Sequence, residues 1–309
     1  MPKEIRYLLL GLVIGGGLIY LLKPARAVVE TEAAVVAPTE VEASFNNGNG
    51  TITGYDLPEA ITFAGEVVPM DREDVAERLD REVQVNAFWH SNAIILMKRA
   101  EKWLPVLDSI LAVHEVPTDF KYLAVAESGL KNVVSPSNAV GFWQFLSGTA
   151  KDFGLIVSSE VDERYDPVKS TVAATKYLKK SYERFGDWTI VAASYNMGMR
   201  ATSQVLSKQK AESYYDMIVS EEPARYVFRI IALKNLLENP EVFRFNVKDG
   251  YRLPKSKDTV LTTSVADWND FAQGQDMTYY QLKKLNPWIR DYKLTIKQGQ
   301  EFTVKVLSE

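Results

Sequence analysis

Residues 166–188, DPVKSTVAATKYLKKSYERFGDW, contain a complete helix together with its start and stop signals. Asp166 is a residue type that caps helix N-termini, and Pro167 supplies the fixed φ of a first helical position. The pattern ends at Gly186, a residue type that commonly follows the last helical turn, and Asp187 can cap a second helix. Two consecutive helices with such signals predict a mainly helical domain.

The helical period continues in both directions and covers residues 71–240 with short breaks. Asp71 is expected to cap the first helix, and Pro105 lies where a new helix can begin. Pro117 is expected to start a short helix, and Pro223 a long apolar one. An all-α domain is therefore the simplest prediction for this region.

The pattern changes after residue 240. Residues 259–263 and 301–306 are short, alternating and rich in β-branched side chains, which is typical of strands. Residues 265–273 and 278–285, between them, have a helical period. The predicted fold is mainly α: a helical domain followed by a small α+β module of strand-helix-helix-strand order.

The amino terminus has the features of a targeting element. Lys3 and Arg6 precede sixteen largely apolar residues, 7–22, and Ala25 and Ala27 fit a small-x-small cleavage site. Sixteen residues are fewer than the roughly 20 of a membrane-spanning helix, so a cleaved signal and a retained membrane anchor both stay open. Either element places the remainder in the periplasm or cell envelope.

The next segment carries spaced glutamates among alanines and valines and then a run of Asn and Gly, so it buries little. The predicted organisation is a signal peptide or membrane anchor at 1–27, a flexible linker at 28–56, a helical domain at 57–245 and a C-terminal module at 246–309.

Composition excludes several classes of function. The formal net charge of −4 over 309 residues gives no sign of nucleic acid binding. The chain has no cysteine, and its two histidines, His90 and His114, lack metal-ligand spacing. We therefore expect no metal and no cofactor, and an enzyme would have to use carboxylates, hydroxyls or amides.

One carboxylate is placed unusually, in the stretch KYLAVAESGL at 121–130. Glu127 shares a helix face with Leu123 and Ala124, which predicts partial desolvation and a raised pKa. A carboxylic acid protonated near neutral pH is what glycosidic bond cleavage requires of its general acid. The alternative interpretation is a solvated glutamate at a helix end.

Three polar and aromatic clusters follow Glu127-Ser128 along the chain: 141–144 (GFWQ), 193–196 (ASYN) and 222–227 (EPARYV). In this order they resemble the lytic transglycosylases of glycoside hydrolase family 23, and its membrane-bound D-type subgroup in particular, over about residues 57–245. The resemblance implies a lysozyme-like helical fold. It also implies cleavage of the β-1,4 bond between N-acetylmuramic acid and N-acetylglucosamine in peptidoglycan, with a 1,6-anhydro sugar as product.

The resemblance implies roles for individual residues. Glu127 is the catalytic acid and base. The residues expected to contact the substrate are Ser135, Gln144, Tyr195 and Tyr226. The residues expected to support the cleft are Ser128, Gly141, Trp143 and Asn196.

The chemistry of a single acid agrees with that implication. Hydrolytic glycosidases normally use two carboxylates, and the motifs at 141–144 and 193–196 offer no second one. Attack by the sugar's own 6-hydroxyl would remove the need for a base that activates water. Asn138 stands where these relatives usually carry glycine, and asparagine tolerates the positive φ of such a turn.

Residues 259–306 resemble a degenerate LysM module, a small peptidoglycan-binding fold, but lack the usual Gly-Asp after the first strand. Glycan binding and a purely structural role both stay open. The expected partners are peptidoglycan glycan strands, and the membrane if the N-terminal segment is retained. Two alternatives to a lytic transglycosylase are a hydrolytic muramidase and a non-catalytic peptidoglycan-binding scaffold.

Overall fold

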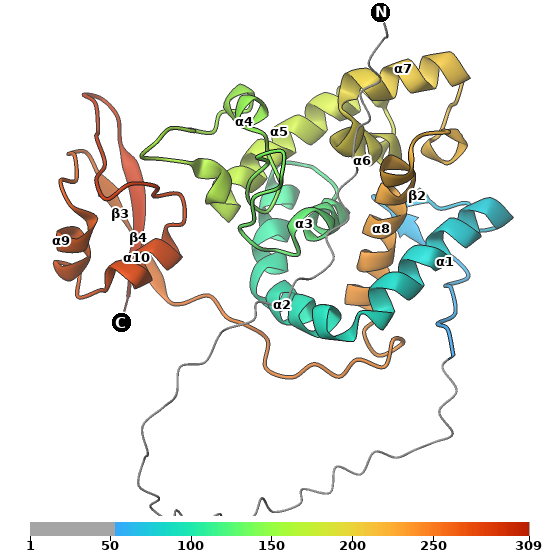
Figure 1. Cartoon of the computed structure of the whole chain (residues 1–309), viewed down its shortest axis with the longest axis horizontal. Coiled ribbons are helices and arrows are strands. Elements are labelled where there is room, and N and C mark those ends of the chain that lie inside the picture. The colour runs from blue at the N-terminus through green and yellow to red at the C-terminus, as the bar shows by residue number, and fades with distance from the viewer. Residues whose placement is uncertain (1–52, 309) are drawn as a thin grey trace, which may run out of the picture. The chain divides into compact units, whose positions relative to one another are not determined.

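A computed structural model describes residues 53–308, which are mostly helical (Figure 1). A two-stranded hairpin, β1 (Thr62–Phe63) and β2 (Glu66–Val67), comes before the first helix. The helices that follow are α1 (Glu73–Phe88), α2 (His90–Val113), α3 (Lys121–Ser128), α4 (Ser147–Asp152), α5 (Pro167–Phe185), α6 (Trp188–Met197), α7 (Met199–Gln209) and α8 (Glu221–Glu238).

Helices α5 and α6 begin and end where their local signals predict. The carboxylate of Asp166 accepts hydrogen bonds from two backbone N–H groups of the first turn of α5. Gly186 ends α5 with a φ of 67°, and Asp187 caps α6 through the N–H of Ile190. The first backbone N–H groups of a helix have no partner within the helix and need such acceptors. These boundaries can therefore be predicted from the sequence.

Three predicted boundaries were wrong. Arg72, not Asp71, is the N-cap of α1, and no side chain caps it. Helix α2 continues through Pro105 although proline has no N–H to donate, because buried side chains such as Leu96 and Leu107 hold both of its halves in the core. Helix α8 begins two residues before Pro223. The β1–β2 hairpin was not predicted.

The helices enclose one hydrophobic core. Helix α8 packs against α1, α3 and α6 (Figure 1). Fully buried side chains from separate helices meet there, among them Leu79 of α1, Leu123 of α3 and Phe228 of α8. This packing brings the last turn of α3 close to the first half of α8.

The C-terminal module has the predicted order of elements: β3 (Ser256–Leu261), α9 (Trp268–Gln273), α10 (Tyr279–Leu285) and β4 (Phe302–Leu307). The two strands are antiparallel, with Ser256 opposite Leu307. The module has its own core, which includes Trp268, Trp288 and Val304. The predicted fold class, mainly helical with a small α+β unit at the C-terminus, is confirmed.

Between residues 53 and 308 no helix is both long and apolar enough to cross a bilayer. The predicted signal or anchor at 1–27 and most of the predicted linker lie outside the described residues. The bounds of the four segments stay a prediction.

Candidate active site

Glu127 lies in the last turn of the short helix α3, which ends at Gly129 with a φ of 58°. Leu123 and Ala124 on the same helix are fully buried, and Glu127 itself is partly buried. From α8, the hydroxyl of Tyr226 donates a hydrogen bond to Oε1 of Glu127. Two residues 99 positions apart are thus joined by the packing of α3 on α8.

Burial raises the pKa of the Glu127 carboxyl to about 7, because desolvation disfavours its charged form. The hydrogen bond from Tyr226 acts in the opposite direction because it stabilises the carboxylate. The negative charge of Glu222 raises the pKa of Glu127 and the positive charge of Arg229 lowers it. Glu127 can therefore both give and take a proton near neutral pH.

Arg229 and Glu222 belong to an ionic cluster that joins α8 to α1. The Arg229 guanidinium binds both carboxylate oxygens of Glu222, at 2.9 and 3.1 Å, and lowers the pKa of Glu222. Buried Glu82 of α1 accepts a 2.6 Å bond from Nε of Arg225, and Nε of Arg229 lies 3.5 Å away. Neither Arg229 nor Glu82 was predicted from the sequence to lie near the site.

Residues 129–146 form a loop between α3 and α4, called the cleft loop below. Its backbone is unusual: Asn138, Gly141 and Gln144 have φ values of 60°, 84° and 47°. A Cβ atom at Gly141 would lie 2.0 Å from the carbonyl oxygen of Arg164, so only glycine fits there. Asn138 keeps the turn with a positive φ, as predicted.

The side chain of Gln144 is turned back onto the cleft loop. Its amide nitrogen donates to the carbonyl oxygens of Gly141, at 2.7 Å, and Val133, at 3.1 Å. Because both partners are acceptors, the NH2 group must face them, and the amide oxygen remains available as an acceptor for a ligand.

Tyr195 of α6 is partly buried and reaches the same loop. Its hydroxyl donates a 2.7 Å bond to the carbonyl oxygen of Trp143. Burial raises the pKa of Tyr195, and the negative charge of Glu127 raises it further. Trp143 itself is fully buried, and its indole N–H binds Thr171 at 2.9 Å. The indole of Trp143 is thus part of the core and does not line a sugar cleft.

Of the remaining predicted residues, Ser135 and Ser128 make local hydrogen bonds. The Ser135 hydroxyl accepts the N–H of Ala139 at 3.0 Å and so shapes the cleft loop. Ser128 is buried and donates to the carbonyl of Ala124, one turn earlier in α3. Asn196 is exposed at the end of α6.

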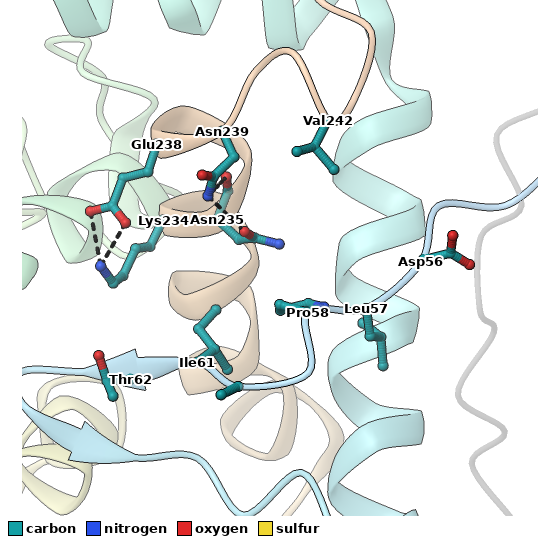
Figure 2. A pocket seen from close by; sticks show the side chains of 11 residues that line it. Asp56, Leu57, Pro58, Ile61, Thr62, Lys234, Asn235, Glu238, Asn239 and Val242 are labelled. Atoms are coloured by element: carbon teal, nitrogen blue, oxygen red, sulfur yellow. Dashed lines mark hydrogen bonds and ion pairs between the residues drawn. The ribbon is translucent and has the colours of Figure 1, made fainter.

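Within residues 53–308, no group of three His, Cys, Asp or Glu side chains could hold a metal ion. A cavity of about 490 Å³ lies between residues 56–62 and the C-terminal half of α8 (Figure 2). Lys234 and Glu238 form an ion pair on its wall at 2.7 Å. None of the predicted site residues lines this cavity, so we do not assign it to the site.

The helical domain that carries Glu127 matches a known family. The model of the Transglycosylase SLT domain covers residues 112–218, which include Glu127, Gln144 and Tyr195. The model of the Soluble lytic transglycosylase C-terminal LysM-like domain covers residues 257–308. The chain thus contains an SLT transglycosylase domain and a LysM-like module, as the resemblance in sequence implied.

Membrane-bound lytic murein transglycosylase D of Escherichia coli strain K12 is a homologue, 25% identical over 234 residues, which are 72% of this chain and 50% of the relative. Its counterpart in E. coli O6:H1 gives the same values. The chain therefore spans about half the length of these curated relatives. Among solved structures, the 70 kDa soluble lytic transglycosylase of E. coli matches 48% of this chain and 26% of its own, at 22% identity and a TM-score of 0.39.

Proposed function

We propose that this protein is a peptidoglycan lytic transglycosylase that cleaves the β-1,4 bond between N-acetylmuramic acid and N-acetylglucosamine without water. The observation that carries the proposal is the Glu127 carboxyl, which lies within the SLT domain and has a pKa of about 7. A group with that pKa is protonated in a useful fraction at neutral pH and can still ionise during the reaction.

The reaction then proceeds through Glu127 alone. Its carboxyl donates a proton to the glycosidic oxygen while the bond from that oxygen to C1 of the N-acetylmuramic acid breaks. The resulting carboxylate accepts the proton of the sugar's own 6-hydroxyl, whose oxygen bonds to C1 and closes the 1,6-anhydro ring. Glu127 ends protonated, as it began.

The other predicted residues assist this cycle by binding and orientation. The Tyr226 hydroxyl, which already donates to Oε1 of Glu127, stabilises the carboxylate formed midway. Gln144 offers its amide oxygen to the sugar, and Ser135 and Tyr195 lie on or against the same loop. Ser128, Gly141, Trp143 and Asn196 maintain the shape of the cleft.

The Glu127→Gln variant tests the proposal, because glutamine keeps the size of the side chain and an oxygen that can accept from Tyr226. Purified sacculi are incubated with parent and variant, and the released muropeptides are analysed by mass spectrometry. We expect anhydro-muropeptides from the parent and a loss of about 100- to 10,000-fold or more in the variant.

Other outcomes would identify the alternatives. Products with reducing ends, each heavier by one water, would indicate a hydrolytic muramidase. Binding to sacculi without any product from the parent would indicate a scaffold. A folded Glu127→Gln protein that releases product near the parent rate would show that Glu127 is not the acid.

We further propose that the protein acts in the cell envelope, held there by residues 1–27 or released after their cleavage. The support is the charged and apolar amino-terminal sequence and the homology to an enzyme that is named membrane-bound. A reporter fused after residue 60 should be active only outside the cytoplasm. Activity of a cytoplasmic reporter at the same position would contradict this location.

A further inference from the structure

Residues 156–166, between α4 and α5, contact the C-terminal module and are called the bridging segment below. Val161 is buried in the core of the module with Trp288 and Ile289. The backbone of Val161 forms an antiparallel bridge with that of Ile289. The neighbouring N–H of Asp162 donates to the carbonyl of Trp288 at 2.9 Å. Val161 of the bridging segment is thus a part of the module's own core.

Polar contacts around Glu160 extend this attachment. Its carbonyl oxygen accepts the N–H of Arg290 at 2.8 Å. Its carboxylate accepts the N–H of Thr295 at 2.7 Å and the hydroxyl of Thr295 at 3.1 Å, and Nζ of Lys293 lies 3.6 Å away. The contact is specific because it combines backbone pairing, apolar burial and a carboxylate that is bound on several sides.

The other end of the bridging segment reaches the cleft loop through Arg164, which is buried. Its guanidinium forms a fork with the Asp162 carboxylate, at 2.9 and 2.8 Å. The remaining nitrogen, Nη1, donates to the carbonyl oxygens of Asn138 and Phe145, both at 3.1 Å. The backbone oxygen of Arg164 is the atom against which Gly141 packs.

We propose that the LysM-like module is a positioning element of the catalytic domain. By holding the bridging segment, it fixes Arg164, and Arg164 fixes the cleft loop that carries Ser135 and Gln144. Because Asp162 pairs with the module through its N–H and with Arg164 through its carboxylate, the two contacts share one residue. The inference rests on the proposed function, in which the cleft loop binds the glycan.

The test uses the full chain with Val161→Asp, which places a charge in the module's core, and with the milder Glu160→Ala, which leaves that core intact. Val260→Asp is the matched control, since Val260 is 57% exposed on β3 of the same module. The substrate is a soluble oligosaccharide of two N-acetylglucosamine–N-acetylmuramic acid repeats.

We expect KM to rise about 10-fold or more in Val161→Asp, because small displacements of the groups that position the substrate weaken its binding and misorient it. The value of kcat should change less than about threefold, since Glu127 and Tyr226 are held by α3 and α8 and not by the cleft loop. Glu160→Ala should shift KM in the same direction by less, and Val260→Asp should behave like the parent.

Hydrogen exchange of the cleft loop provides a readout that does not depend on activity. Amides such as those of Val140 and Gly141, which are bonded within the loop, should exchange faster in Val161→Asp and Glu160→Ala than in Val260→Asp, while α8 keeps its protection. Unchanged hydrogen exchange in the cleft loop would overturn the proposal. Variants that are impaired only on long glycan strands would also overturn it, because they would indicate that the module binds glycan directly. If even the parent cleaves nothing, the proposed function fails and the exchange data alone decide the positioning role.

Discussion

The raised pKa of Glu127 predicts that this residue makes the folding stability depend on pH. A folded-state pKa of about 7 against an ordinary 4.5 means that the native protein holds this proton more tightly than the unfolded chain does. The stability that the proton supplies is complete below pH 4.5 and is lost as the pH rises through about 7. At about 1.4 kcal/mol per pH unit, the loss is about 3 kcal/mol.

Glu127→Gln removes this dependence, because glutamine is neutral at every pH. The variant should match the parent near pH 4.5 and exceed its free energy of unfolding by up to about 3 kcal/mol at pH 8. For a protein of this length, a gain of about 3 kcal/mol in the free energy of unfolding raises Tm by about 6 to 12 °C. Thermal melts of both proteins between pH 4.5 and 8 measure it.

Glu77→Gln serves as the control because Glu77 is an exposed carboxylate on α1. It should melt like the parent at each pH. A Tm difference between Glu127→Gln and the parent that is the same at pH 5 and pH 8 would refute the reasoning, since it would show that ionisation of Glu127 carries no folding penalty.

Two further predictions concern the tuning of the acid and the shape of the loop. Tyr226→Phe removes a hydrogen bond that lowers the pKa of Glu127, so it should move the alkaline limb of the rate–pH profile to higher pH. Glu222→Gln removes a charge that raises the pKa of Glu127, so it should move the same limb to lower pH. Rates on soluble glycan from pH 5 to 9 measure both shifts, and shifts of the same sign would contradict the assignment. Gly141→Ala should lower the free energy of unfolding by about 3 kcal/mol or more, because its Cβ would lie 2.0 Å from a carbonyl oxygen. Gly65→Ala, with a similar φ of 83° and nothing within 4 Å, should lose only about 1 to 2 kcal/mol, and denaturant unfolding compares the two.

Local signals in the sequence predicted helices well where the contacts that end a helix are themselves local. Asp166 and Gly186 bond within a few residues of their own positions, so their meaning does not depend on the rest of the fold. Pro105 shows the opposite case. Its local preference favours a helix start, but α2 passes through it because the flanking turns are buried against distant parts of the chain.

The same contrast holds at the candidate site. The apolar face around Glu127 predicted a desolvated acid, and the structure gives it a pKa of about 7. Glu222, Arg225, Tyr226 and Arg229 stand at spacings of three, four and seven, so they share one face of α8, and this spacing was a signal that Arg229 belongs near the site. Nothing local indicated Glu82, because α1 and α8 are joined only in the folded protein.

The pKa of Glu127 is set by opposing effects of unequal size. Burial acts most strongly and raises it, and the Tyr226 hydroxyl comes next and lowers it. Glu222 and Arg229 are bound to each other and follow with opposite signs, Glu222 raising the pKa and Arg229 lowering it. Packing of α3 on α8 therefore determines the proton affinity of Glu127, and the ionic cluster only adjusts it. An enzyme that uses one carboxyl as both acid and base needs this arrangement, because a strong net charge beside Glu127 would favour one of its two protonation states and slow the step that needs the other.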